Sequence, residues 1–415
     1  MRAIEEQAKQ AFEASKPLAF LSSAVKNVAL IQMADDLVAH AAYLIEENAK
    51  DLEAGKKAGL TAALLDRLLL DDWRIVGMAE GLRRLSTLAD PIGEVIAGWT
   101  LPNGLEILKK RVPLGAIGII YEARPNVTAD AIGLCLKTGN SVVLRGSSTA
   151  VHSNKAIAAI LTTAAEKAGI PSGAIQLLDD VTRQGVETFV KLNQYLSVII
   201  PRGGADLIQS VVRNATVPTI ETGIGNCHIF VDASADLANA VEIVFNSKVQ
   251  RPSVCNSCET VLVHEAIAAR FLTQLAARLS AAGVELRGCD QTLAILPTVK
   301  SATQDDWKSE YLDLILAIKI VSGVAEAIAH IGQYGTLHTE SILSQDMAAI
   351  SAFTTQVDAA AVMVNASTRF TDGGEFGFGA EMGISTQKLH ARGPMGLPEL
   401  TTYKYIVIGD GQVRG

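Results

Sequence analysis

Residues 112–130 of the chain read VPLGAIGIIYEARPNVTAD. The run from Ala116 to Tyr121 is apolar and uninterrupted, which is typical of a strand buried on both faces of a parallel sheet. A polar turn, Glu122 to Asn126, follows directly. Ligands of parallel α/β sheets bind beyond the carboxyl ends of the strands, so this turn is a candidate binding position.

Similar short apolar runs recur at 141–144, 174–177 and 197–200, and helical stretches separate most of them. This succession predicts βαβ units and a parallel sheet. Residues 216–220 favour a strand more weakly, because Pro218 removes a ladder donor. A second α/β round follows Cys227, with strands expected near 229–231, 260–263, 316–321, 341–343 and 361–365.

The segments outside this alternation have patterns of their own. Residues 1–90 carry apolar side chains at helical spacing. Residues 92–112 form two β-like segments around Pro102-Asn103-Gly104, and Asn-Gly is a strong hairpin signal. A final strand is expected near 400–408. We therefore expect two α/β domains with a projecting β-ribbon.

Composition limits the classes of protein to which the chain can belong. Of its 415 residues 49% are hydrophobic and 19% charged, which is enough apolar material for large cores. The net charge of −8 argues against binding to nucleic acid or to an anionic membrane. Five cysteines do not make a disulfide framework, and the N-terminus lacks the apolar core of a signal peptide. These features predict a soluble protein of a reducing cytoplasm.

Two further strand ends lead into loops that resemble phosphate-binding loops, because glycine permits close backbone approach and arginine supplies charge. Neither loop matches the G-x-G-x-x-G fingerprint of dinucleotide sites. An ordinary βα turn rich in Gly and Ser remains the alternative. The two loops are Arg145-Gly146-Ser147-Ser148 and Pro201-Arg202-Gly203-Gly204.

A candidate nucleophile lies in the loop Arg251-Pro-Ser-Val-Cys255-Asn-Ser-Cys258, between a predicted helix over 236–249 and a strand over 260–263. The C-x-x-C spacing also fits a metal site, but a second ligand pair is missing. A thioredoxin-type pair would open a helix after a strand, whereas this pair precedes a strand. Two buried small side chains are the plainest alternative, and that interpretation is kept for the remaining cysteines, Cys135, Cys227 and Cys289.

The surroundings of Cys255 distinguish it from an ordinary buried cysteine. The chain contains, in order, VPLGAIGIIYEARPNVTAD, VVLRGSS, VIIPRGGADLI, GIGNCHIFVDASADL, QRPSVCNSCETVLVH and VNASTRFTDGGEFGFGAEMGISTQKLHARGPMGLPELTTYK. Together these blocks resemble the γ-glutamyl phosphate reductases (glutamate-5-semialdehyde dehydrogenases), a family within the aldehyde dehydrogenase superfamily. The resemblance covers essentially the whole chain, and the RPxxCN and STQKLHARGPMGL blocks are highly specific.

The resemblance implies a fold and a reaction. The fold is a Rossmann-like cofactor domain, an α/β catalytic domain, and a β-hairpin that forms an oligomerisation element with the C-terminal strand. The reaction is the NADPH-dependent reduction of L-glutamyl 5-phosphate to glutamate 5-semialdehyde and phosphate, in proline biosynthesis. Cys255 matches the catalytic cysteine, which forms a thioester. Asn126 matches the asparagine whose amide joins the Cys255 N–H in an oxyanion hole.

The resemblance also assigns cofactor residues. Arg145 stands where many relatives have a lysine near the adenosine ribose, and with Ser147 and Ser148 it suits a 2′-phosphate. Glu310 falls where the superfamily binds the nicotinamide ribose, although Leu312 stands where Phe is usual. Glu221 matches the general base of hydrolytic aldehyde dehydrogenases; here it is either structural or assists deprotonation of Cys255. The remaining cofactor residues expected are Gly146, Pro201, Arg202, Gly203 and Gly204.

The substrate requires groups that bind a carboxylate, an ammonium and a phosphate. Arginine suits the two anionic groups, and an acidic side chain suits the ammonium. An ordinary surface charge is the alternative interpretation for each candidate residue. The Lys-Lys-Arg run at 109–111 is interpreted as a solvated face of the hairpin. The candidates are Arg124, Arg251 and Arg369 for the anions, and Glu122 or Asp372 for the ammonium.

The expected domains are an NADPH-binding domain over 1–225, interrupted by the hairpin at about 92–112, a catalytic domain over 226–370, and a C-terminal segment over 371–415. A homodimer or tetramer is expected. Any glutamate 5-kinase is expected to be a separate chain, and no metal is expected. Two other functions stay open: a hydrolytic aldehyde dehydrogenase that uses Glu221, and a C-x-x-C metal-binding or redox-sensing protein.

Overall fold

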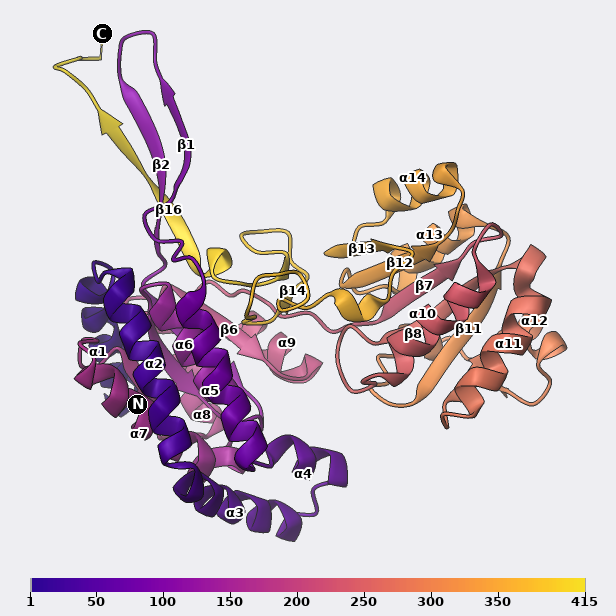
Figure 1. Cartoon of the computed structure of the whole chain (residues 1–415), viewed down its shortest axis with the longest axis horizontal. Coiled ribbons are helices and arrows are strands. Elements are labelled where there is room, and N and C mark those ends of the chain that lie inside the picture. The colour runs from indigo at the N-terminus through magenta and orange to yellow at the C-terminus, as the bar shows by residue number, and fades with distance from the viewer. Residues whose placement is uncertain (1, 415) are drawn as a thin grey trace. The chain divides into compact units, whose positions relative to one another are not determined.

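The computed structural model describes residues 2–414, and these form two compact units (Figure 1). Of the described residues, unit 1 comprises 2–221, 377–383 and 395–414, and unit 2 comprises 222–376 and 384–394. The predicted C-terminal segment over 371–415 is therefore divided between the two units and does not form a body of its own. The predicted boundary near 225 lies a few residues beyond the one observed.

Unit 1 is built on a four-stranded parallel sheet in the order β5-β4-β3-β6. Its central strand β3 is buried at every position, as the uninterrupted apolar run predicts. Residues 216–220 form no strand: Thr219 makes only an isolated bridge to Ile199, beside the proline that lacks an N–H. The four strands are β3 (Ala116–Tyr121), β4 (Ser141–Arg145), β5 (Ile175–Leu177) and β6 (Val198–Arg202).

Helices cover both faces of this sheet. One face packs against α1 and α8, through a core that includes Ile4, Ala8 and Phe189. On the other side α6 contacts α5 and α2, so closely that a Cβ on Gly133 would lie 2.5 Å from a Leu82 methyl. The helices are α1 (Arg2–Leu18), α2 (Ser23–Ala39), α3 (Ala41–Lys57), α4 (Ala62–Leu68), α5 (Asp72–Thr87), α6 (Asn126–Lys137), α7 (Val151–Lys167), α8 (Arg183–Phe189) and α9 (Ala205–Asn214).

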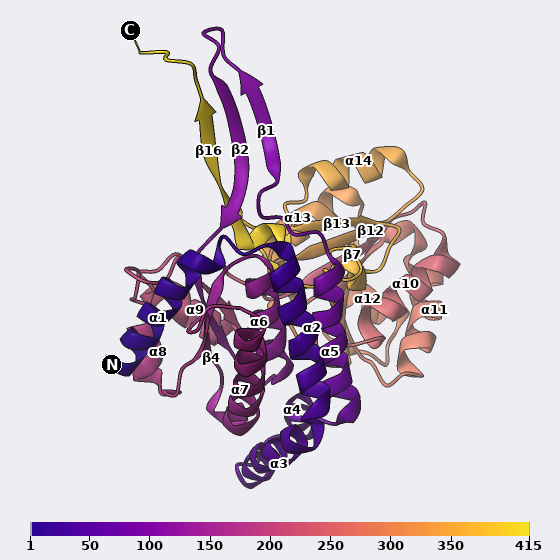
Figure 2. The same ribbon diagram turned by 60° about the vertical axis from the view of Figure 1, so that its left-hand side comes forward.

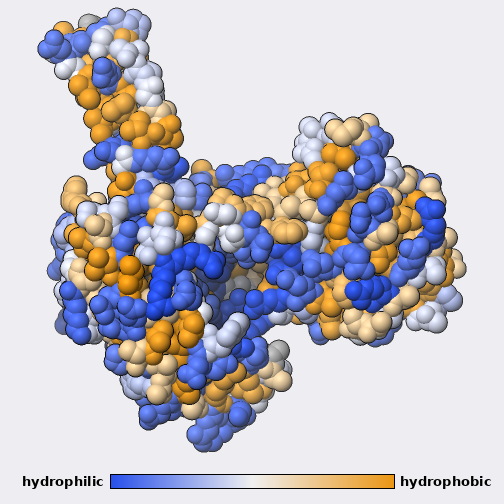
Figure 3. All heavy atoms as spheres, viewed as in Figure 1, coloured by the Kyte–Doolittle hydropathy of each residue, from blue (hydrophilic) through white to orange (hydrophobic). Residues whose placement is uncertain are grey.

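A three-stranded antiparallel arm extends from the helices of unit 1 in both ribbon views (Figures 1 and 2). It consists of the predicted hairpin, β1 (Val95–Thr100) and β2 (Glu106–Pro113), and the final strand β16 (Thr401–Ile408). The turn contains Gly104 at φ +86°, a conformation that glycine adopts without steric cost. Hydrophobic atoms lie along the surface of the arm (Figure 3). The exposed large apolar and aromatic side chains of the arm include Val95, Trp99, Tyr405, Val407 and Ile408.

Unit 2 contains a seven-stranded parallel sheet in the order β10-β9-β11-β8-β7-β12-β13. All five strands predicted for this second round are present. The short pair β14 (Ile384–Ser385) and β15 (Gly393–Pro394) lies apart from the sheet. The sheet strands are β7 (Cys227–Val231), β8 (Cys258–His264), β9 (Glu285–Gly288), β10 (Lys300–Ser301), β11 (Ile315–Val321), β12 (Thr339–Leu343) and β13 (Ala361–Val364).

Two hydrophobic cores sandwich this sheet. The helices α10 and α11 pack on one face, around Phe271 and Leu275, and α13 and α14 pack on the other, around Phe353. Successive side chains of β7 point to opposite faces of the sheet. Ile229 and Val231 belong to the core under α10, whereas Phe230 belongs to the core under α14. The helices are α10 (Leu237–Val249), α11 (Ala268–Ser280), α12 (Asp290–Ile295), α13 (Val324–Tyr334) and α14 (Met347–Gln356).

Among residues 2–414 no single helix is long and apolar enough to cross a membrane. Only α2 and α3 taken together meet that length and composition test, and a bend of 70° separates them.

Candidate active site

Three of the predicted binding loops lie at one edge of the unit 1 sheet. β3 lies between β4 and β6, so the loops that follow these parallel strands meet at its carboxyl edge. The loop after β3 contacts the one after β6, because the Gly204 N–H donates to Glu122 Oε1 at 3.0 Å. A Cβ on Gly203 would lie 2.6 Å from the Glu122 carboxyl carbon. Glu122 therefore fixes the 201–204 loop, a role that its assignment to a substrate ammonium did not anticipate.

The loop after β4 encloses buried donors that have no partner among residues 2–414. These donors are Arg145 Nε and Asn154 Nδ2. A Cβ on Gly146 would lie 2.2 Å from Asn154 Nδ2, so any larger residue would have to displace the Asn154 side chain. Asn154 is held in turn by Thr128, which donates to its Oδ1 at 3.1 Å. Unpaired buried N–H groups are rare in folded proteins, and two beside a glycine-containing loop suit an anion.

Asn126 begins α6, directly after the Arg124-Pro125 turn. Its Nδ2 donates to Asp130 Oδ2 at 3.0 Å, one helical turn further on. Burial raises the pKa of the Asp130 carboxyl to about 6, and the hydrogen bond from Asn126 opposes that rise. The amide is thus oriented by a neighbour four residues along the same helix.

Cys255 lies in the loop between α10 and β8 and is partly exposed. Cys258, which the sequence pattern also places in this loop, is instead the first residue of β8 and is fully buried. Burial raises the pKa of the Cys258 thiol, whose Sγ donates to the Thr260 carbonyl at 3.4 Å. The two cysteines of the C-x-x-C motif therefore differ in accessibility, which favours Cys255 as the reactive one.

The backbone of Cys255 is held from the start of β7. Cys227 donates through Sγ to the Cys255 carbonyl at 3.2 Å. Burial keeps the pKa of the Cys227 thiol well above its usual value, so this donor stays protonated. Gly225 also packs directly against this carbonyl group. A Cβ built on Gly225 would lie only 1.4 Å from the Cys255 carbonyl oxygen. Sequence reasoning interpreted Cys227 only as a buried small residue and missed this role.

A guanidinium lies beside the Cys255 loop. Arg369 donates through Nη1 to Asn256 Oδ1 and through Nε to Gln250 at 2.7 Å. Burial and the nearby charge of Arg251 lower the pKa of Arg369, and attraction to Asp372 and Cys255 opposes that shift. Three predicted substrate residues, Arg251, Arg369 and Asp372, therefore gather near Cys255 within unit 2.

Glu310 reaches the same region from the segment before β11. Its Oε1 accepts the Gly225 N–H at 2.7 Å, and burial raises the pKa of its carboxyl. Nearby, Lys248 and Glu259 form an ion pair at 2.6 Å with no exposed surface on either side chain. Burial raises the pKa of the Glu259 carboxyl, and the charge and hydrogen bond of Lys248 oppose the rise and favour the carboxylate. No local pattern in the sequence predicts this pair, because its two residues belong to different elements, α10 and β8.

The predicted residues thus form two groups. Unit 1 brings together the residues 122–126, 145–148 and 201–204 at one sheet edge. Unit 2 brings together Cys255, Glu310 and the arginines of the Cys255 loop. The approach of Asn126 to Cys255 stays a prediction.

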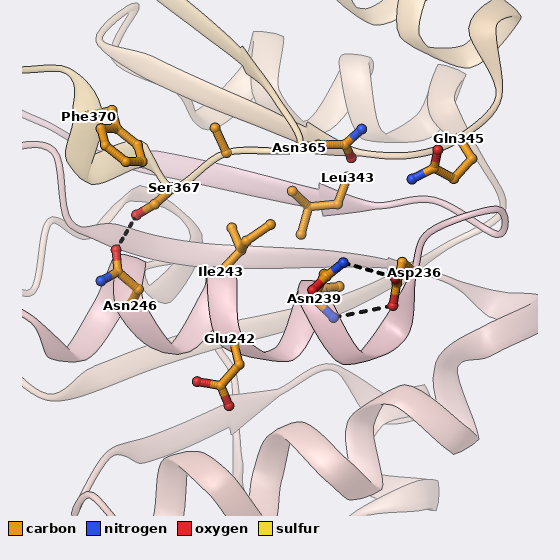
Figure 4. A pocket seen from close by; sticks show the side chains of 12 residues that line it. Asp236, Asn239, Glu242, Ile243, Asn246, Leu343, Gln345, Asn365, Ser367 and Phe370 are labelled. Carbon is orange, nitrogen blue, oxygen red and sulfur yellow. Dashed lines mark hydrogen bonds between the residues drawn. The ribbon is translucent and has the colours of Figure 1, made fainter. Parts of the chain in front are cut away.

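Unit 2 also contains a pocket of about 500 Å³ along α10 (Figure 4). Ile243, Leu343 and Phe370 form apolar parts of its wall. Its polar side chains are partly engaged with one another: Ser367 donates to Asn246 at 2.7 Å, and Asn239 donates to Asp236 at 2.9 Å. None of the predicted catalytic, cofactor or substrate residues lines it.

Comparison with known proteins identifies the family. The model of the aldehyde dehydrogenase family matches residues 2–313. The chain belongs to the aldehyde dehydrogenase family. It is 57% identical over 411 residues to γ-glutamyl phosphate reductase of Caldanaerobacter subterraneus subsp. tengcongensis, covering 99% of both chains. It is 58% identical over 411 residues to γ-glutamyl phosphate reductase of Moorella thermoacetica, covering 99% of this chain and 98% of that protein.

Solved structures agree with this assignment. The crystal structure of γ-glutamyl phosphate reductase from Thermotoga maritima matches with a TM-score of 0.97 and 50% identity, over 99% of this chain and 100% of that one. An acetylating aldehyde dehydrogenase from Geobacillus thermoglucosidasius has the same fold at 18% identity, with a TM-score of 0.71, over 100% of this chain and 98% of that one. The predicted family and the aldehyde dehydrogenase-like α/β fold are confirmed. As a member of this family the protein is an oxidoreductase that uses a nicotinamide cofactor.

Replacing Gly225 by alanine is expected to disturb the loop that carries Cys255. The added Cβ would overlap the Cys255 carbonyl, a backbone atom that cannot rotate away. We expect unit 2 to lose on the order of 1–3 kcal/mol of stability, together with a changed alkylation rate at Cys255. Thermal unfolding and iodoacetamide kinetics measure the two effects.

The matched control is Gly332→Ala in α13, where a Cβ would meet nothing within 4 Å. This change should be neutral or stabilising by about 1 kcal/mol, because alanine is the better helix former. Equal effects of the two substitutions would contradict the steric argument.

The buried His338, next to Cys227, is expected to lower the stability of unit 2 against unfolding at acidic pH. Burial lowers its pKa from 6.5 to about 4, so between these values the unfolded chain binds more protons than the folded one. Stability is therefore retained above pH 6.5 and lost as the pH falls toward 4. By linkage the loss from this group is about 2 kcal/mol at pH 5.

Urea unfolding of the wild type and of His338→Asn, compared at pH 8 and pH 5, isolates this contribution. The fluorescence of Trp307, buried in unit 2, reports the transition. The stability difference between the two proteins should shrink at pH 5. A difference independent of pH would show that folding does not lower the pKa of His338.

Proposed function

We propose that the protein reduces L-glutamyl 5-phosphate to L-glutamate 5-semialdehyde with NADPH, releasing phosphate, in the second step of proline biosynthesis from glutamate. One observation carries the proposal: a partly exposed cysteine whose backbone is held by Cys227 and whose neighbour is the Arg369 guanidinium. The names of the full-length relatives support the choice of substrate.

The residues of unit 1 fit the cofactor that the family implies. The unpaired Arg145 Nε and Asn154 Nδ2 supply buried donors for a phosphate, and Gly146 permits close approach of its oxygens. Ser147 and Ser148 follow in the same loop, and Glu122 holds the 201–204 loop beside it. A bound nicotinamide supplies hydride; the protein supplies position and charge.

In the proposed reaction the Cys255 thiolate attacks the acyl carbon and phosphate leaves with the bonding electron pair, which gives a thioester. With the nicotinamide bound, its hydride would reduce the thioester, and Cys255 would leave as the thiolate and release the aldehyde. Asn126 donates to the oxyanion that develops in each half-reaction. The Arg369 guanidinium stabilises negative charge beside Cys255.

Within unit 2, Arg251 and Arg369 suit the anionic ends of the substrate, and Asp372 suits its ammonium. Arg124 is proposed to contribute from unit 1. Glu122 is the weaker candidate for the ammonium, because its carboxylate already accepts the Gly204 N–H.

The test is an assay of both directions. We expect NADPH oxidation with L-glutamyl 5-phosphate, and phosphate-dependent reduction of NADP with the semialdehyde. Reduction of NADP that proceeds equally well without phosphate would instead indicate hydrolysis of the thioester, with Glu221 as the base. Stoichiometric zinc, or a reversible Cys255–Cys258 disulfide that alone controls activity, would favour the C-x-x-C alternative.

Replacing Arg145 by alanine is expected to raise KM for NADPH by about 10- to 100-fold, the loss of a charge-assisted hydrogen bond. KM for NADH should change little, because NADH lacks the 2′-phosphate. The neighbouring, exposed Arg183 offers the control: Arg183→Ala removes the same charge from the first residue of α8. Similar effects on both cofactors would contradict the assignment of Arg145.

The arm supports a homo-oligomer, a dimer or a tetramer. Its exposed hydrophobic residues and outer strand edges are of the kind that proteins cover with a partner. No disulfide joins the five cysteines, which supports a reducing, cytoplasmic location. A separate glutamate 5-kinase is proposed to supply the acyl phosphate.

A further inference from the structure

The ion pair between Lys248 and Glu259 is buried in unit 2 at the end of α10 and within β8. Taking two charges out of water is costly, and well-packed hydrophobic pairs of similar size often stabilise a protein equally well. Stability alone therefore does not explain a fully buried pair. Its remaining contacts indicate another role.

The second oxygen of the Glu259 carboxylate contacts a strained piece of backbone. Oε1 accepts the Leu312 N–H at 3.3 Å, and Leu312 has φ +54°. This left-handed conformation is unfavourable for a leucine and persists only where surrounding contacts impose it. The Leu312 side chain is 38% exposed, so packing of the side chain does not impose it.

The strained residue stands two positions after Glu310. The Glu310 carboxylate accepts the Gly225 N–H at 2.7 Å, and Gly225 packs on the Cys255 carbonyl. Between them, Tyr311 donates to Asp306 at 2.8 Å. The segment 310–312 is thus anchored at each residue, and Glu259 supplies the anchor at the strained one.

We propose that Lys248 and Glu259 are positioning residues: the buried carboxylate holds Leu312 in its left-handed conformation and thereby places the Glu310 carboxylate for cofactor binding. Lys248 balances the charge that this anchor requires. The inference rests on the proposed function for the role of Glu310. It predicts that the acceptor at residue 259, and not its charge, sets cofactor affinity.

Three variants of the full chain test this prediction. Lys248→Met with Glu259→Gln removes both charges and keeps an acceptor for the Leu312 N–H. Lys248→Met with Glu259→Leu removes the acceptor as well, and an apolar pair of this size is expected to fold. The third variant adds Leu312→Gly to the second, because glycine adopts positive φ without steric cost.

Two readouts are measured on each: the NADPH Kd by fluorescence titration, and hydrogen exchange of residues 309–314 without cofactor. We expect a Kd within about 3-fold of wild type for the Gln variant, and at least about 10-fold weaker binding with faster exchange for the Leu variant. The added glycine should restore Kd to within about 3-fold.

Wild-type Kd in the Leu variant, or no recovery on adding glycine, would overturn the inference. Faster hydrogen exchange of residues 309–314 with an unchanged NADPH Kd would also overturn the inference. Glu259 would then hold Leu312 in place without any effect on cofactor binding. Failure of the wild-type chain to bind NADPH would instead overturn the proposed function.

Discussion

Replacing Cys255 by serine is expected to abolish turnover in both directions, with a loss of at least about 10³-fold in kcat. A hydroxyl remains protonated at neutral pH, whereas the proposed reaction needs a thiolate that attacks and later leaves. Binding of the cofactor should persist, because its proposed contacts come from other residues. Steady-state kinetics and the NADPH Kd measure the two quantities.

Cys258→Ser is the control, because Cys258 is buried at the start of β8 and uses its thiol only to reach the Thr260 carbonyl. A serine hydroxyl donates the same hydrogen bond. This variant should retain kcat within a few-fold of the wild type. Equal loss in both variants would contradict the single-nucleophile mechanism and favour a function that needs both thiols.

Replacing Asn126 by aspartate is expected to lower kcat by about 10²–10³-fold, the usual cost of one oxyanion-hole donor. The substitution keeps the size of the side chain and removes both N–H donors, while a negative charge now faces the developing oxyanion. KM for the cofactor should change little. The rate of thioester formation in a single turnover measures the effect directly.

Asp130→Asn tests whether the charge near Asn126 matters on its own. The neutral side chain keeps an oxygen that can accept from Asn126 Nδ2, as Asp130 does at 3.0 Å. Asp130 contacts the amide of Asn126 and acts only through it, so loss of its charge should change kcat only a few-fold. A loss as large as that of Asn126→Asp would show that Asp130, and not the amide, carries the effect.

Local patterns predicted most of the architecture. Uninterrupted apolar runs predicted β3 and β4, because a strand buried on both faces is mostly apolar. Five of the seven strands of the second sheet were also predicted, but the short strands β9 and β10 were not. The Asn-Gly turn located the hairpin of the arm, because few dipeptides adopt its backbone conformation. The weak strand at 216–220 failed for an equally local reason, since Pro218 has no N–H to donate.

The environments of the candidate site residues were predicted less well than the secondary structure. The sequence separated Cys255 from the other cysteines only through its family resemblance, and it placed Cys258 in the loop, where the structure has a buried strand residue. It assigned Glu122 to a substrate ammonium, whereas the carboxylate holds the loop at Gly204. In both cases the sequence does not show the environment of the side chain, which depends on how the elements pack.

The sequence by itself determined the succession of elements, the family, and the loop that carries Cys255. Only the tertiary structure decided what surrounds that loop: Cys227 and Gly225 against the Cys255 carbonyl, Glu259 beneath Leu312, and Asn154 beneath Gly146. The reason is physical. Periodicity and turn chemistry act between residues a few positions apart, whereas these contacts arise only once the strands have paired and the helices have packed over them.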